Sequence, residues 1–384
     1  MTAASDSLTP RQKWGAFAVT VAVAIATILD LVKVNVTLAP IEHTLGATSS
    51  QSQLIVAGYV LAFGILLVPS GRLGDLWNRK AMFIIGLLTF MAASLLCALA
   101  WHANVLVAAR FVQGFAAGLL MPQVIGLIQN LFQGPERGRA FGIFGASIGL
   151  GTAFGPTIGG LLIGALGEDL GWRWTFGMNV PIALIILPFA LKLLPNRQRH
   201  LKREGRRDLD LVGVVLMAAT VLLVMLPFVL TTGTAADDPA RWWLLVGALV
   251  AGAVFVAWER RYLAAGRDPV IDFGLFRYAS YRNGVIITTV WFAVMPPMFL
   301  VMTLYTQQGL GHPAVVVGMI TIPYAFVSAA VAAWSGRHTF THAAALVLAG
   351  ALIYVVALVG MIAVGLWAAP EATPWLFAGV LAIG

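Results

Sequence analysis

The sequence predicts an all-α membrane protein that crosses the bilayer many times. Of its 384 residues, 60% are hydrophobic and only 10% are charged, and the mean hydropathy is +0.89. Soluble domains carry about 25% charged residues, so this composition excludes a soluble globular protein, and it also excludes a disordered chain. The apolar residues gather in runs long enough to cross a bilayer as helices. The single cysteine, Cys97, excludes an intramolecular disulfide.

The apolar runs predict eleven complete spans and part of a twelfth. The first span follows a short polar leader with no small-residue cleavage site, so it is interpreted as an uncleaved helix rather than a signal peptide. The last run reaches Gly384 and is too short to cross the bilayer, so we expect a C-terminally truncated chain. The predicted spans are 15–39, 52–71, 81–100, 103–128, 140–165, 175–194, 211–230, 242–258, 284–306, 314–336 and 341–366, with the partial span from 374.

The basic residues indicate the orientation of these spans. With the N-terminus inside, 20 of the 24 Lys and Arg residues fall on the inner side, two fall outside and two lie within spans. Positive residues concentrate on the cytoplasmic side of membrane proteins, so we expect a cytoplasmic N-terminus. The same bias explains the net charge of +8 without nucleic-acid binding. The run 197–207 could also contact anionic lipid headgroups.

The order of spans predicts four regions. These are a cytoplasmic leader (1–13), a six-helix bundle (14–195), a region with a basic loop, two inserted helices and an amphipathic linker (196–282), and a partial second bundle (283–384). A weak internal repeat supports this division, because Ser70-Gly71-Arg72 ends the second span and Ser335-Gly336-Arg337 ends the tenth. Repeated helical units of this kind are typical of secondary transporters.

The break between the second and third spans reads Gly71-Arg-Leu-Gly-Asp-Leu-Trp-Asn-Arg-Lys80. It resembles the signature loop of the major facilitator superfamily, with Leu76 and Asn78 in place of a usual Arg and Gly. The resemblance implies a major facilitator fold, with two pseudo-symmetric six-helix bundles, a two-helix insertion and an incomplete second bundle. It also implies a part in gating for four residues of the loop; the alternative is a plain basic turn. These residues are Gly71, Asp75, Arg79 and Lys80.

The fifth span carries closely spaced glycines. Its segment Gly151-Thr-Ala-Phe-Gly-Pro-Thr-Ile-Gly-Gly160 resembles the superfamily's antiporter motif, which is associated with exporters. Small residues four apart also allow plain close packing of helices, and proline favours a bend. The resemblance implies conformational roles for Gly151, Gly155, Pro156, Gly159 and Gly160.

The first span contains Leu29-Asp-Leu-Val-Lys-Val-Asn-Val-Thr-Leu-Ala-Pro40, which resembles a motif of the fourteen-helix drug/proton antiporter branch. The segment Trp172-Arg-Trp-Thr-Phe-Gly-Met-Asn-Val-Pro181 also resembles sequences of the same branch.

Asp30 is the one acid inside a predicted span, so it is the candidate proton-coupling residue. Lys33 departs from the branch pattern and can pair with Asp30 at i+3, either for coupling or as a structural ion pair. Asn35 and Thr37 offer hydrogen bonds nearby.

The fourth span contains Arg110-Phe-Val-Gln-Gly114, similar to a motif in which the Arg assists proton transfer. A buried Arg needs a polar partner, and its alternative role is helix packing. We assign Asp30 and Arg110 to proton coupling. We assign four further residues to the substrate cavity, which are Lys33, Asn35, Thr37 and Gln113.

These motifs predict a proton-coupled antiporter that exports hydrophobic small molecules (drugs, toxins or secondary metabolites) from bacteria by alternating access. We expect a monomer in the cytoplasmic membrane, driven by the proton-motive force, with no cofactor, no metal site and no nucleic-acid partner. The pair with Lys33 also makes an anionic or zwitterionic substrate plausible, and the alternative is a transporter of lipids or lipid-like precursors. A membrane enzyme or a channel fits less well, because no cluster of acids or histidines and no ring of charges is present.

Overall fold

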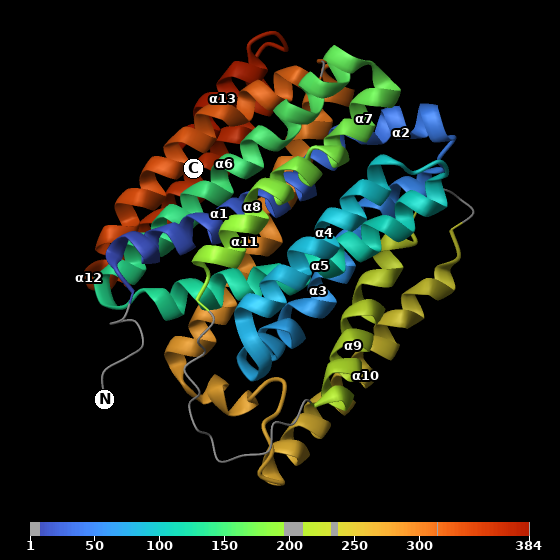
Figure 1. Cartoon of the computed structure of the whole chain (residues 1–384). Helices are drawn as coiled ribbons and strands as arrows, with labels where there is room; N and C mark the ends of the chain where they lie inside the picture. Colours follow the sequence, from blue (N-terminus) through green and yellow to red (C-terminus); the bar gives the residue numbers. More distant parts are fainter. Residues whose placement is uncertain (1–7, 196–209, 232–236, 313, 384) are drawn as a thin grey trace. The chain divides into compact units, whose positions relative to one another are not determined.

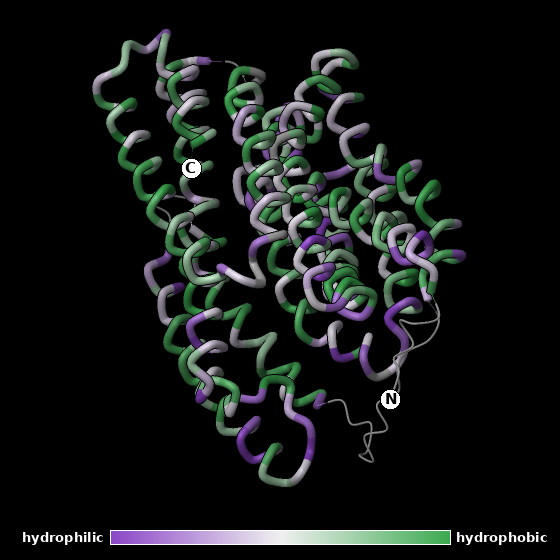
Figure 2. The backbone as a smooth tube through the Cα atoms, turned by 90° about the vertical axis from the view of Figure 1, so that its left-hand side faces the viewer, coloured by the Kyte–Doolittle hydropathy of each residue, from purple (hydrophilic) through white to green (hydrophobic). Residues whose placement is uncertain are grey.

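The computed structural model describes residues 8–195, 210–231, 237–312 and 314–383, which contain helices and no strand. Residues 1–7 of the leader and 196–209 of the basic loop, with the run 197–207, lie outside this part. Ten helical segments of the described chain are long and apolar enough to cross a membrane. Figure 2 shows hydrophobic colours along most of the helical backbone. The prediction of a multi-pass helical membrane protein is therefore confirmed.

The helices follow the predicted spans closely. The first span is a continuous helical segment made of α1 (Pro10–Lys33), a 3₁₀ turn (Val34–Thr37) and α2 (Leu38–Leu45). The remaining helices are α3 (Ser49–Leu73), α4 (Arg79–Ala98), α5 (Ala103–Leu131), α6 (Gly134–Leu166), α7 (Glu168–Gly177), α8 (Asn179–Leu193), α9 (Leu211–Val229), α10 (Trp243–Ala264), α11 (Ala279–Leu304), α12 (Ala314–Trp367) and α13 (Thr373–Ile383).

Local sequence signals explain where several helices begin. Thr9 starts α1 as a capping box, in which its hydroxyl accepts from the Gln12 backbone and the Gln12 side chain accepts from the Thr9 backbone. Thr48 and Gln51 repeat this arrangement at α3. The predicted span from 175 begins earlier, at Glu168, where acidic residues stabilise the helix N-terminus.

The two predicted spans 314–336 and 341–366 are joined in α12 without a loop. The backbone leaves the helical region at His342, with φ −131° and ψ 28°, so the kink lies at the start of the span Thr341–Trp367, shortly after the span Val316–Gly336. Figure 1 shows the two parts of α12 as neighbouring ribbons. The number of spans predicted here is unchanged, but the connection is a kink in a helix.

The described helices form two compact units, and each is considered by itself. The first unit contains residues 1–44, 124–194 and 302–384, and so holds α1, α2, α6, α7, α8, α12 and α13. Within it α1 packs on α6 and α8, α6 packs on α12, and α12 packs on α13 (Figure 1). The glycine-rich α6 therefore has a neighbour on each of two faces.

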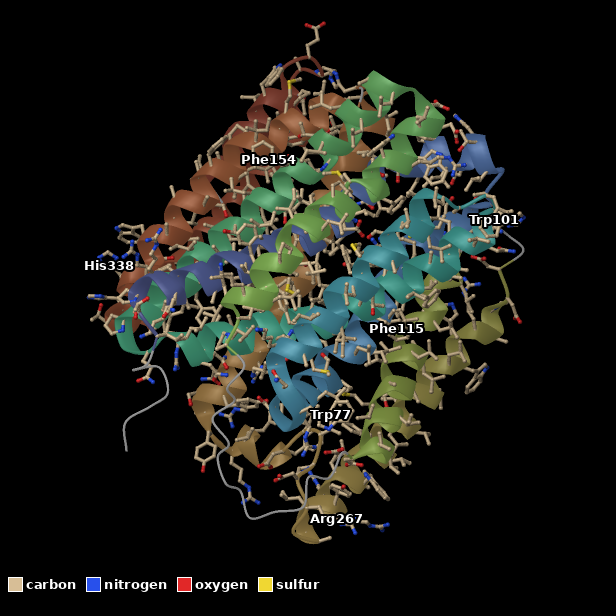
Figure 3. All side chains as sticks on the ribbon, in the orientation of Figure 1. Trp77, Trp101, Phe115, Phe154, Arg267 and His338 are labelled. Carbon is tan, nitrogen blue, oxygen red and sulfur yellow. The ribbon has the colours of Figure 1, made fainter. Side chains whose placement is uncertain are left out.

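The second unit contains residues 45–123 and 195–301. It holds α3, α4, most of α5, the hairpin α9–α10 and most of α11, and α9 packs on both α3 and α10. Figure 3 shows Trp77 and Arg267 towards one end of this unit and Trp101 at the other. The division into units groups helices differently from the four predicted regions, which remain a prediction.

Candidate functional site

Asp30 lies in a buried cluster with Lys33 and Asn179 in the first unit. The Lys33 Nζ is 3.3 Å from Asp30 Oδ1 and donates a 2.8 Å hydrogen bond to Asn179 Oδ1. The Asn179 amide donates to Asp30 Oδ1 at 2.6 Å. None of the three residues is more than 2% exposed. Because a buried charge is costly unless it is paired, this closed triangle makes the two charges tolerable inside the span.

The backbone beside this cluster changes helix type. Lys33 ends α1, and the 3₁₀ turn Val34–Thr37 follows at once. Pro40 accounts for the change, because it has no N–H for the carbonyl of Val36 and its ring would crowd that carbonyl in an α-helix. A short 3₁₀ stretch within a helix often marks a hinge. The predicted coupling residue thus lies next to the least regular part of the first span.

The other two polar residues of this motif do not join the cluster. The Thr37 hydroxyl is buried and donates to the Val34 carbonyl at 2.7 Å, so it is bound to its own helix. Asn35 is exposed, although it lies in the middle of an apolar helix. Asn179, in contrast, was not assigned to the site from sequence. The signal that could have found it is an amide at the start of an apolar run, within the segment Trp172–Pro181.

One glycine face of α6 packs against the first span at this cluster. A Cβ on Gly155 would lie 3.1 Å from Val32 Cβ and 3.3 Å from the Lys33 backbone nitrogen. A Cβ on Gly159 would lie 2.6 Å from a methyl group of Val36 and 3.3 Å from the Lys33 carbonyl. These two glycines therefore let α6 touch the backbone around Lys33. Gly151 packs less tightly, near Ile25 and Ile28, whereas a Cβ on Gly160 would meet nothing within 4 Å.

The other glycine face of α6 packs on α12. A Cβ on Gly142 would lie 2.7 Å from the Ala332 carbonyl oxygen, and Gly138 and Gly336 face each other at comparable distances. Further along, the rings of Phe154 and Phe326 meet edge to face at 6.4 Å. Figure 3 labels Phe154 on this helix. The helix remains continuous through Pro156 and links the Lys33 region to α12.

Arg110 is the centre of a second buried cluster, in the other unit. Its Nε donates to the Ile55 carbonyl at 2.9 Å, and one Nη donates to Gln113 Oε1 at 2.7 Å. Its guanidinium lies 4.3 Å from the centre of the Tyr59 ring. The Gln113 amide donates to the Ser94 hydroxyl at 2.8 Å. Arg110 and Gln113 are fully buried, so neither is open to solvent.

The signature loop forms a π-helical turn, Gly74–Asn78, between α3 and α4. Asp75 and Arg79 form an ion pair across it, and Arg79 also donates to the Pro122 carbonyl at 3.2 Å. Asn78, one of the two residues that depart from the family pattern, caps α4 by accepting from the Lys80 and Ala81 backbone N–H groups. The Lys80 side chain is 8% exposed.

Gln123 holds this turn from α5. Its amide nitrogen donates to the Ser70 carbonyl at 2.7 Å, and Ser70 donates to the Gly118 carbonyl at 2.6 Å. A Cβ on Gly74 would lie 1.9 Å from Gln123 Oε1, so any larger residue there would displace the end of the Gln123 side chain. A Cβ on Gly71 would meet Pro122 at 3.5 Å. Gln123 was not predicted as a functional residue.

The structure thus brings the predicted residues together in pairs. Asp30 joins Lys33 in the first unit, and Arg110 joins Gln113 in the second unit, which also carries Gly71, Asp75, Arg79 and Lys80. Among the described residues no group of three or more His, Cys, Asp or Glu side chains could hold a metal ion.

Similarity to known proteins identifies the family. The chain is 38% identical over 303 residues to the probable actinorhodin transporter of Streptomyces coelicolor, covering 78% of this chain and 51% of that protein. It is 34% identical over 322 residues to the puromycin resistance protein of Streptomyces alboniger, covering 84% of this chain and 61% of that protein. The chain thus spans about half to three fifths of the length of these relatives.

The fold is that of a solved transporter. The structure of the proton:xylose symporter XylE superposes with a TM-score of 0.68 and 13% sequence identity, covering 98% of this chain and 80% of that one. Residues 16–384 match the Major Facilitator Superfamily. The chain therefore belongs to the major facilitator superfamily, a family of membrane transporters rather than enzymes.

Proposed function

We propose that this protein exports hydrophobic small molecules, drugs or antibiotics among them, in exchange for protons. Relatives named for actinorhodin transport and for puromycin resistance support this substrate class. We further propose a bacterial cytoplasmic membrane location with the N-terminus inside, a monomeric state and the proton-motive force as the energy source. The observation that carries the proposal is the buried triangle of Asp30, Lys33 and Asn179 beside the 3₁₀ turn of the first span.

The triangle gives proton binding a structural consequence. When Asp30 is ionised, it holds Lys33 and the Asn179 amide, and so ties the first span to α8. A proton on Asp30 removes the ion pair, while Lys33 can keep its hydrogen bond to Asn179 Oδ1. Gly155 and Gly159 bring α6 against Val32, Lys33 and Val36. A movement of Lys33 would therefore change the packing of α6 on the first span. Packed elements of this kind shift between discrete arrangements rather than deforming smoothly.

The charge of the substrate and the direction of coupling are linked through this site. A cationic substrate that displaces Lys33 from Asp30 competes with the proton, and such negative linkage produces exchange. An anionic substrate that captures Lys33 frees Asp30 to take up a proton, and such positive linkage produces co-transport. Proton-coupled export by exchange therefore favours a cationic or neutral substrate. The exposed amide of Asn35, two residues after Lys33, is suited to hydrogen-bond such a molecule.

The second candidate function is transport of a lipid or lipid-like precursor. The observation that favours it is Lys33, a buried cation within the span that could bind a phosphate or carboxylate group of the substrate. In that case proton and substrate would bind together rather than compete.

The proposal is tested with inverted membrane vesicles that accumulate ethidium or puromycin. Accumulation should require a proton gradient, and an uncoupler should abolish it. Asp30→Asn should fold but lose gradient-driven accumulation, whereas Glu42→Gln, at an exposed carboxylate, should behave as wild type. Transport that is unchanged by the uncoupler would exclude antiport, and wild-type activity in Asp30→Asn would remove Asp30 from the mechanism.

A further inference from the structure

The inserted hairpin α9–α10 carries a second buried carboxylate pair, apart from the cluster around Asp30. Asp210 immediately precedes α9, and Glu259 lies in the last turns of α10. Their side chains are 2% and 1% exposed. From sequence, both were placed in basic loops outside the spans, so neither was considered for the transport chemistry.

Asp210 has the hydrogen bonds of an ionised carboxylate. Its Oδ1 accepts from the Gly213 backbone at 2.7 Å and from the Trp258 indole at 2.9 Å, and its Oδ2 lies 3.1 Å from the same indole nitrogen. It also caps the N-terminus of α9, where the helix dipole favours negative charge. Donors on both α9 and α10 therefore hold the Asp210 carboxyl in place.

Glu259 is held differently at its two oxygens. Its Oε2 accepts from the Ile271 backbone at 3.0 Å, which ties α10 to the segment that follows it. Its Oε1 is buried and receives no hydrogen bond from the described residues. Glu259 Oε1 and Asp210 Oδ2 lie 2.2 Å and 2.5 Å from the single point where a Cβ on Gly213 would stand, so the two carboxyl groups are neighbours within reach of a hydrogen bond between them. When both groups are ionised, all four oxygens are acceptors, so a hydrogen bond between the two carboxyl groups needs a proton on one of them.

No cation compensates this pair among the described residues. The charged groups on the neighbouring elements are Arg72 of α3, whose Nη donates to the Asp268 carbonyl, and Arg267, which lies over the Tyr262 ring. Arg260 and Arg261 of α10 are exposed. Asp272 accepts from the Gly274 backbone and so turns towards its own segment. Ionisation of one carboxyl group disfavours ionisation of the other when the two are buried this close together.

We propose that Asp210 and Glu259 bind one shared proton at neutral pH, with Glu259 Oε1 donating it to Asp210 Oδ2. The protonated acid supplies the donor that the geometry lacks, and it joins the start of α9, the end of α10 and Ile271 in one network. When the proton leaves to solvent, the carboxylates repel and this end of the hairpin loosens. Gly213 permits the contact because it has no side chain. The site does not depend on the proposed transport cycle.

Infrared spectroscopy of the purified protein in lipid nanodiscs tests this site directly. A protonated carboxyl group has a C=O stretch separate from that of carboxylates and shifts on deuteration. We expect this band in wild type at neutral pH and its loss on alkaline titration. Glu259→Gln should remove it, and Glu371→Gln, at an exposed carboxylate, should not. Asp30→Asn should also leave the band in place, which separates this site from the transport proposal.

Asp210→Asn provides the second variant in case Glu259→Gln does not fold. Asparagine caps helices as well as aspartate does, so α9 should be retained. Its amide would donate to Glu259 and favour the carboxylate, so the band should be lost at neutral pH. A wild-type spectrum without a protonated carboxyl band, or a band that survives the Glu259 and Asp210 substitutions, would overturn the proposal.

Discussion

The two buried clusters in the predicted spans each stabilise a buried cation, but they do so with different groups. Lys33 is neutralised by a full negative charge on its own helix, with an amide of α8 bridging the pair. Neutral groups are among the contacts of Arg110, namely the Ile55 carbonyl, the Gln113 amide and the Tyr59 ring. The first arrangement changes with protonation of one carboxyl, whereas the Ile55 carbonyl and the Gln113 amide of the second carry no proton that they can gain or lose near neutral pH. This difference indicates why Asp30 is the better candidate for coupling.

The largest effect is expected at Lys33. Lys33→Met leaves Asp30 buried without its cation, and breaking a buried pair on one side costs about 3–5 kcal/mol. The double variant Asp30→Asn with Lys33→Met should recover most of this stability, because both charges are gone. Unfolding in detergent by denaturant measures both values. A double variant as unstable as Lys33→Met would show that the charge pair is not what holds this region.

A smaller loss is expected at Arg110. Arg110→Met removes the donors that bind the Ile55 carbonyl and Gln113 Oε1, and leaving such buried acceptors without donors costs about 1–3 kcal/mol. The same denaturation experiment compares it with Lys33→Met. The contrast between the clusters is wrong if the Arg110 variant is the less stable of the two.

The glycine face of α6 offers a matched pair of substitutions. Gly159→Ala places a methyl group 2.6 Å from Val36 and should destabilise the protein by about 1–3 kcal/mol and slow transport, because overpacking displaces the 3₁₀ turn. Gly160→Ala meets nothing within 4 Å and should be neutral or slightly stabilising, since alanine is the better helix former. Equal effects at both positions would argue against tight packing on the first span.

The smallest effect concerns the signature loop. Gly74→Ala should be destabilising by about 1 kcal/mol, because its methyl group collides with the Gln123 amide. Adding Gln123→Ala makes room for that methyl group, so the double variant should be no worse than Gln123→Ala alone. Thermal unfolding of the three variants measures the coupling, and strictly additive losses would contradict the contact.

Most of the helical architecture could be predicted from the sequence, because long apolar runs in a membrane have few alternatives to helices. The pair Asp30–Lys33 was also predictable, because a separation of three residues places both on one helix face. Asn179 was not, since only the packing of α8 on α1 brings it there. The pairing of Asp210 with Glu259 depends in the same way on the α9–α10 hairpin. The kink at His342 and the 3₁₀ turn Val34–Thr37 could not be predicted from the pattern of apolar residues, because neither feature interrupts that pattern.

The most direct test of the central claim compares two probes of similar shape and opposite charge. Binding of tetraphenylphosphonium and of tetraphenylborate to the purified protein is measured as a function of pH, in wild type and in Asp30→Asn. Proton exchange at Asp30 predicts that the cation binds more weakly as the pH falls, and that Asp30→Asn removes this dependence. Cation binding that is independent of pH, or equally pH-dependent in Asp30→Asn, would contradict the account.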